Sequence, residues 1–239
     1  MKIQATELLN SLFKFLRTYN GPIDYQQGYQ VLDYFLTNFF DYQLNGKENV
    51  PEAGPLIVCS NHTSFMDMLQ VAHAVYPHQV SFLAKPEFFE YENIIEKKMR
   101  GLGLMNLVGY TAKKAGKIIT EQCLEWGMLR IDRKKKSTDQ LKDIVKQSPN
   151  KNLGIFPEGT RTRTGKLGKF YGFCALVMKR TGSPIVPIGI KGTYKLWPGA
   201  LYKKRSIEVN IGEPLQASDY ENKGEILESL EGRIRELVS

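Results

Sequence analysis

The chain has few cysteines and no long apolar run. Its 239 residues include three cysteines, which have neither the spacing of a metal site nor the pattern of a disulfide framework. No 18 consecutive residues are apolar, so the sequence predicts no membrane-spanning helix, and no signal-peptide core is present. No G-x-S-x-G motif occurs, which argues against a serine hydrolase. Together these absences favour a reducing location on the cytoplasmic side of a membrane.

Positive charge is in excess. The chain carries 33 Lys and Arg residues against 25 Asp and Glu residues, a net charge of +8. Such a balance favours an anionic partner, which could be nucleic acid, acidic lipid or a phosphorylated substrate. Three consecutive lysines at 134–136 would each favour binding to anionic lipid by about 1 kcal/mol near a membrane surface. The alternative is that these lysines belong to a solvated loop.

The first 50 residues are unusually aromatic. They hold 10 of the 26 aromatic residues, and apolar residues recur there at helical spacing on both sides of Asn20, Gly21 and Pro22. We expect residues 1–50 to form a hairpin of two amphipathic helices that associates with a membrane. The alternative is that its apolar stripe packs against the rest of the protein as core. Residues 51–239 would then form one α/β domain.

Strand-like and helix-like patterns alternate after residue 50. This order predicts an α/β fold with a single mixed sheet flanked by helices. We expect strands at 56–60, 80–84, 127–132, 152–156, 185–190 and 206–211. We expect helices at 63–75, 87–99, 138–147, 168–181 and 219–237, with a further helical stretch at 111–125. A proline inside the 185–190 strand favours a sheet edge or an irregular end.

His62 and Asp67 have the residue types of a general base and its partner. Side chains five residues apart point about 140° apart on a helix and to opposite faces of a strand. They can meet only if His62 lies on a turn and Asp67 on the helix that follows. The apolar run at 56–59, followed by the helix-capping types Ser60 and Asn61, predicts such a turn. The alternative is a surface histidine with a solvated carboxylate.

A second turn combines the groups that bind phosphate. Phe156 ends a buried strand, and Pro157 and Gly159 then break it. The backbone N–H groups, the hydroxyls and Arg161 of this segment suit a phosphate oxyanion, and Glu158 could hold the guanidinium in place. The alternative is a charged hairpin tip whose surface ion pair contributes little stability.

Four blocks in fixed order resemble the glycerolipid acyltransferases typified by 1-acyl-glycerol-3-phosphate acyltransferase, the bacterial PlsC type. They are N-H-x-x-x-x-D at 61–67, G-x-x-x-I-D-R at 127–133, F-P-E-G-T-R at 156–161 and a V-P strand at 186–188. The resemblance implies that His62 is the catalytic base and Asp67 its partner. It also implies that the acceptor phosphate is bound by five residues: Arg133, Glu158, Gly159, Thr160 and Arg161.

The resemblance further implies the reaction. A fatty acyl group would move from a thioester, coenzyme A or acyl carrier protein, to the 2-hydroxyl of 1-acyl-glycerol-3-phosphate, giving phosphatidic acid. Glycerol-3-phosphate or another lysolipid is an alternative acceptor, and a non-enzymatic protein that binds anionic membranes is an alternative class. We expect no metal, no cofactor beyond the acyl donor and no nucleic-acid partner. The expected location is the cytoplasmic face of the cell membrane, with anionic lipids as neighbours.

Overall fold

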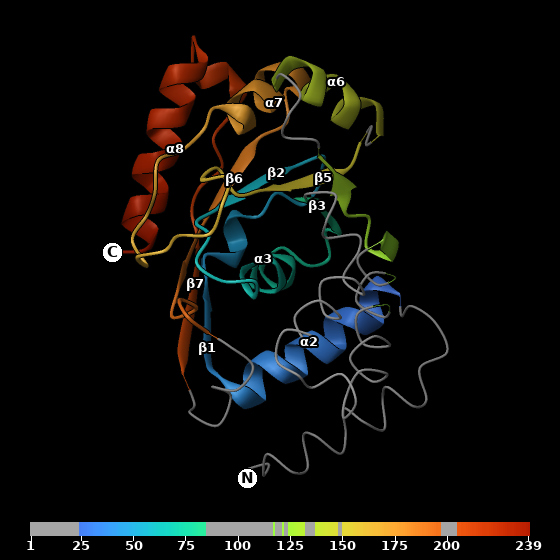
Figure 1. Cartoon of the computed structure of the whole chain (residues 1–239), viewed down its shortest axis with the longest axis vertical. Coiled ribbons are helices and arrows are strands. Elements are labelled where there is room, and N and C mark those ends of the chain that lie inside the picture. Colours follow the sequence, from blue (N-terminus) through green and yellow to red (C-terminus); the bar gives the residue numbers. More distant parts are fainter. Residues whose placement is uncertain are drawn as a thin grey trace, which may run out of the picture.

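A seven-stranded sheet forms the centre of the molecule (Figure 1). The computed structural model describes residues 24–84, 117, 121, 124–131, 137–147, 150–196 and 205–239. The strands are β1 (Asp41–Asn45), β2 (Ile57–Ser60), β3 (Val80–Ala84), β4 (Leu129–Arg130), β5 (Asn152–Ile155), β6 (Ile185–Lys191) and β7 (Ser206–Ile211), in the order β1-β7-β6-β2-β5-β3-β4. Among the strand pairs of the described residues only β6–β7 is antiparallel, so the prediction of a single mixed sheet is confirmed.

Helices cover both faces of the sheet. They are α2 (Tyr25–Phe39), α3 (Asp67–Ala74), α6 (Ser137–Gln147), α7 (Phe173–Thr181) and α8 (Lys223–Leu237), with short 3-10 turns at Lys47–Asn49 and Ala217–Asp219. Figure 1 shows α2 and α3 on one side and α6, α7 and α8 on the other. Side chains of a strand alternate between faces, so Val58 packs with α2 and α3 while Ile57 and Cys59 pack with the other helices. Both faces of the central strands are therefore buried, as parallel sheets require.

Most predicted elements are present, with shifted starts. Helices α3, α7 and α8 begin four or five residues later than predicted, and the predicted 127–132 strand is reduced to the two residues of β4. The predicted 87–99 helix lies outside the described residues. Strand β6 is interior, not an edge, and Pro187 directly precedes its first residue paired with β7. The missing N–H of Pro187 therefore falls where the antiparallel ladder has not yet begun.

Strand β1 was not predicted. Residues 41–45 were assigned to the amino-terminal hairpin, but they form an edge strand that pairs with β7. The helix before it also joins the core, because Leu36 in α2 and Phe40 directly after it are fully buried. Core packing, the alternative left open above, thus holds for this face of α2. Residues 1–23, with the predicted first helix, lie outside the described residues.

Polar contacts fix α2 and β1 to α3. His73 on α3 lies with Nε2 3.0 Å from an oxygen of Asp33 and Nδ1 3.0 Å from the hydroxyl of Tyr42. Asp33 comes from α2 and Tyr42 from β1. His73 is therefore a structural residue that joins three elements. None of the described helices combines the length and the apolar character needed to cross a membrane.

Candidate active site

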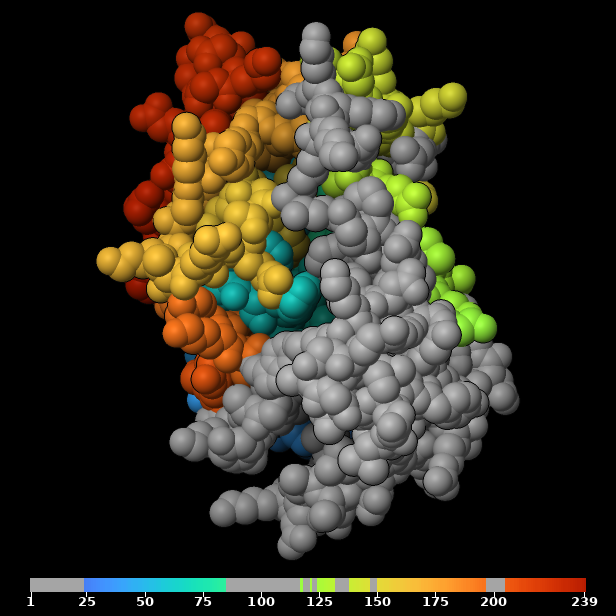
Figure 2. All heavy atoms as spheres, viewed as in Figure 1, coloured from blue at the N-terminus to red at the C-terminus, as the bar shows by residue number. Residues whose placement is uncertain are grey.

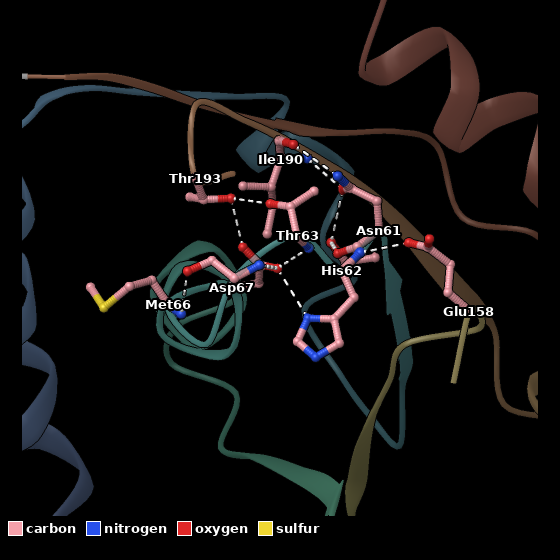
Figure 3. Close-up of polar contacts among 10 residues, drawn as sticks. Asn61, His62, Thr63, Met66, Asp67, Glu158, Ile190 and Thr193 are labelled. Atoms are coloured by element: carbon pink, nitrogen blue, oxygen red, sulfur yellow. Dashed lines mark hydrogen bonds and ion pairs between the residues drawn. The ribbon is translucent and has the colours of Figure 1, made fainter. Parts of the chain in front are cut away.

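His62 and Asp67 meet at the end of β2. His62 lies on the turn that follows the strand, and Asp67 is the first residue of α3. The two atoms His62 Nδ1 and Asp67 Oδ2 are 3.0 Å apart (Figure 3). The Asp67 side chain is fully buried, whereas that of His62 is 16% exposed. The turn-then-helix geometry predicted from the spacing is thus present.

The Asp67 carboxylate fixes the tautomer of the imidazole ring. An ionised carboxylate only accepts hydrogen bonds, so Nδ1 of His62 must be the donor. In the neutral ring Nε2 then carries a lone pair, and Figure 3 shows it on the side of the ring away from Asp67. A neutral imidazole held in this tautomer, with a buried carboxylate behind it, has the arrangement that a general base requires.

Further hydrogen bonds hold the carboxylate in place. Oδ2 of Asp67 accepts from the backbone N–H groups of Thr63 at 2.5 Å and Ser64 at 2.7 Å. Oδ1 accepts from the hydroxyl of Thr193 at 2.7 Å. Charge-assisted bonds of this kind are the stronger ones, so Asp67 is held in one orientation. No sequence pattern pointed to Thr63 or Thr193 as a partner of Asp67. The available signal for Thr193 was its place just beyond β6, a strand parallel to β2.

Asn61 ties the turn to β6. Its Nδ2 donates to the carbonyl of Ile190 at 2.9 Å, and its Oδ1 accepts from the N–H of Ile190 at 2.8 Å. The side chain is buried, so these bonds extend the pairing of β2 with β6 beyond the last strand residue. The interpretation of Asn61 as a helix cap is therefore wrong.

The second turn lies directly beside the first. In Figure 2 the yellow atoms of the segment around 157–171 adjoin the teal atoms of the segment around α3. The His62 ring stacks on the ring of Phe156, with centroids 4.0 Å apart and planes 14° apart. The N–H of Thr162 donates to the carbonyl of His62 at 2.8 Å. The two segments that carry the motifs are thus brought together.

Glu158 binds backbone groups, and its predicted ion pair with Arg161 is wrong. Its Oε1 accepts from the N–H of His62 at 2.7 Å, and its Oε2 accepts from the N–H of Gly168 at 2.8 Å. Burial raises the pKa of the Glu158 carboxyl above its ordinary value, although these two N–H groups act in the opposite direction. A buried carboxylate with both oxygens occupied shapes the two turns, and its charge does not suit direct contact with phosphate.

Arg161 stands at the surface beside the histidine turn. Its guanidinium lies over the ring of Phe65, 3.5 Å from the centroid, and both side chains are exposed. Stacking on an aromatic face leaves the edge N–H groups free to bind an anion. Gly159 has a φ of +65°, a conformation that favours glycine, and Thr160 is exposed next to it. Arg133 lies outside the described residues.

Comparison with known proteins agrees with this geometry. A model of the acyltransferase family matches residues 41–191, which include both turns. A 1-acyl-sn-glycerol-3-phosphate acyltransferase of Bacillus subtilis is 25% identical over 202 residues, covering 80% of this chain and 85% of that one. The chloroplastic enzyme BAT2 of Brassica napus is 26% identical over 187 residues, and this chain aligns with 46% of its length.

A solved structure has the same fold. The crystal structure of the 1-acyl-sn-glycerophosphate acyltransferase PlsC from Thermotoga maritima aligns over 99% of this chain and 81% of its own, with a TM-score of 0.57 and 22% identity. That identity supports the fold alone. The family model, in contrast, covers more than half of the sequence and contains the paired His62 and Asp67. The chain therefore belongs to the acyltransferase family, in agreement with the PlsC-type resemblance of its sequence.

Proposed function

We propose that the protein moves a fatty acyl group from a thioester donor to the 2-hydroxyl of 1-acyl-glycerol-3-phosphate, forming phosphatidic acid. The observation that carries the proposal is the 3.0 Å contact between Nδ1 of His62 and Asp67, which leaves Nε2 as a base. The printed names of the relatives from Bacillus subtilis and Brassica napus support the choice of acceptor.

The mechanism requires one base and no covalent intermediate on the protein. Nε2 of His62 takes the proton of the 2-hydroxyl while its oxygen attacks the thioester carbonyl. Asp67 stabilises the imidazolium that forms. The C–S bond then breaks, and the imidazolium gives its proton to the leaving sulfur. Ser64 lies two residues from His62 and also carries a hydroxyl, but it is buried, and its hydroxyl oxygen accepts from the N–H of Met66 at 3.2 Å. This suits a role in the turn, not that of a nucleophile.

Arg161 and Arg133 are proposed to hold the acceptor phosphate, together with Gly159 and Thr160. The exposed guanidinium of Arg161, supported by the Phe65 ring, can bind two phosphate oxygens at once. Glu158 would act indirectly, by fixing both turns through their backbone N–H groups.

The reaction is proposed to occur at the cytoplasmic face of the cell membrane. Acceptor and product carry acyl chains, so the site must reach lipid while the phosphate stays in water. The net charge of +8 supports attraction to anionic head groups. The basic side chains of Arg163, Lys166 and Lys169 are exposed in the segment that follows Arg161. The donor is proposed to be acyl-coenzyme A or acyl-acyl carrier protein, with no other cofactor.

Thiol release from the acyl donor tests the proposal. The purified protein should release thiol with lysophosphatidate as acceptor, and more slowly with glycerol-3-phosphate or an acceptor that lacks phosphate. His62→Ala should lose about 10²–10⁴-fold in kcat while staying folded. Near-normal turnover by a folded His62→Ala protein would show that His62 is not the base.

His78→Ala is the matched control. Nε2 of His78 lies 2.8 Å from the carbonyl oxygen of Pro51. His78 comes just before β3, at the amino-terminal ends of the parallel strands, whereas His62 lies at their carboxyl ends. This variant should keep its kcat even where its stability falls.

A further inference from the structure

Thr193 is brought to Asp67 by a glycine turn at the end of β6. Gly192 has a φ of +87°, and a Cβ atom there would collide with the carbonyl oxygen of Ser206. Only glycine suits both conditions. The chain therefore turns sharply after Lys191, and Thr193 faces the carboxylate from the side opposite to the His62 ring (Figure 3).

The hydroxyl of Thr193 donates its single proton to Asp67. The hydroxyl is fully buried and donates to Oδ1 of Asp67 at 2.7 Å, with no exposure through which water could compete. The hydroxyl oxygen of Thr63 lies 2.6 Å from that of Thr193. Because the proton of Thr193 is already used, the hydroxyl of Thr63 must be the donor in this second bond. Two hydroxyls thus form a directed chain from Thr63 through Thr193 to the carboxylate.

The two carboxylate oxygens have different roles. Oδ2 receives three donors, from the backbone of Thr63 and Ser64 and from the ring of His62. Within the described part of the chain, Oδ1 has one hydrogen-bond donor, the hydroxyl of Thr193. The terminal torsion of an aspartate is broad, so donors at one oxygen alone leave the carboxylate plane free to tilt. The bond from Thr193 supplies the second anchor.

We propose that Thr193 is a positioning residue for acyl transfer, with Thr63 orienting its hydroxyl. It keeps the plane of Asp67 aligned with Nδ1 of His62, and through it keeps Nε2 aimed at the acceptor hydroxyl. This inference rests on the proposed function, in which His62 is the base. Thr193 is fully buried, so in this proposal it acts through Asp67 and His62 and not by contact with substrate.

Thr193→Val tests the proposal, because valine keeps the shape and removes the hydroxyl. The kcat should fall about 10- to 100-fold, the effect expected for one hydrogen bond to a charged group. The acceptor KM should stay within about twofold, since no substrate contact is lost. Thr193→Ser restores the donor and should recover most of the kcat. Thr181→Val removes a hydroxyl that donates to Val177 on α7 and should leave the kcat unchanged.

A second background separates positioning from structural support. Asp67→Asn already disrupts the tautomer of His62, so Thr193→Val should cause little further loss in that background. An equal loss in both backgrounds, or normal kcat in Thr193→Val, would overturn the proposal. If Thr193→Val does not fold, Thr63→Val provides the test. Its kcat should fall by less than the 10- to 100-fold expected for Thr193→Val. In the Asp67→Asn background, Thr63→Val should cause no further fall in kcat.

The His62→Ala variant keeps this test separate from that of the proposed function. A fully active His62→Ala protein refutes the proposed base whatever happens at residue 193. An inactive His62→Ala protein together with a fully active, folded Thr193→Val protein refutes only the positioning role.

Discussion

Replacing Asn61 by alanine should weaken the fold and slow the reaction at the same time. The substitution leaves the buried N–H and carbonyl of Ile190 without the partners that Asn61 supplies at 2.8 and 2.9 Å. Each unsatisfied group costs about 1–3 kcal/mol, so the free energy of unfolding should fall by about 2–6 kcal/mol. Water that enters the space vacated by the side chain would bring the loss toward the lower end.

The effect on the reaction follows from the position of Asn61 next to His62. Freed from β6, the turn lets the imidazole shift, and a shift on the order of 1 Å can cost about 100-fold in rate. We expect kcat to fall about 10- to 100-fold in protein that is still folded. Urea unfolding gives the stability change, with a midpoint lower by about 1 M or more at the usual slope. Thiol release gives kcat in the same preparation.

Asn152→Ala is the matched control for this prediction. Its side chain also joins two backbone groups, accepting from the N–H of Leu56 at 2.9 Å and donating to the carbonyl of Gln79 at 3.2 Å. These bonds lie at the opposite end of β2 from the candidate site. Asn152→Ala should therefore lose stability but keep kcat. Equal loss of kcat in both folded variants would refute the reasoning, because the effect of Asn61 would then be global.

Three further predictions follow from the site and the fold. Arg161→Lys keeps the charge but loses two-point contact, so the KM for lysophosphatidate should rise about 10-fold in thiol-release assays, with little change for an acceptor that lacks phosphate. Burial raises the pKa of the Glu158 carboxyl above its ordinary value of 4.5, so the folded protein holds this proton more tightly than the unfolded chain. The stability that this proton binding adds is fully present below pH 4.5 and is lost as the pH rises through the pKa of the folded state. In urea unfolding, wild type should therefore gain stability relative to Glu158→Gln as pH falls from neutral toward 4. Leu36→Ala should cost about 2–5 kcal/mol in the same assay, whereas Val31→Ala on the exposed face of α2 should cost less than about 0.5 kcal/mol.

Local patterns predicted the central strands and the layered α/β architecture well. The apolar run before His62 and the strand before Pro157 stand in the sheet as β2 and β5. Both are short runs bounded by turn residues, which is the clearest signal of a buried parallel strand. The spacing of His62 and Asp67 permits only one local geometry in which they meet, and the apolar run at 56–59 with the residues that follow it predicted the turn that this geometry requires.

Strand β1 could not be predicted from the sequence for a physical reason. It has only two apolar residues, Tyr42 and Leu44, and its side chains alternate between exposed and half-buried. It directly follows an aromatic-rich helix, with no glycine or proline between them. The apolar residues of such a half-buried edge strand therefore look like a continuation of the apolar stripe of the preceding helix. Only its pairing with β7, far away in the sequence, defines it.

The supporting contacts of the site were equally hidden. The charge of Glu158 predicted a partner of opposite charge, but its partners are backbone N–H groups, which every residue except proline has and which the sequence therefore does not reveal. Thr193 acts on Asp67 across 126 positions of sequence. Spacing rules describe contacts within one turn or one helix, so they cannot reveal partners that only the sheet topology brings together.

Backbone hydrogen bonds of His62 link the histidine turn to the 156–162 turn, so neither turn can be exchanged between relatives without the other. The N–H of His62 donates to the Glu158 side chain and its carbonyl accepts from the N–H of Thr162, so the second segment binds both backbone polar groups of this one residue. A chimera that imports the 61–67 segment from a relative without its 156–162 partner would seat the imported histidine against a mismatched turn. Recombination between relatives should therefore yield active enzymes mainly when both segments come from the same parent.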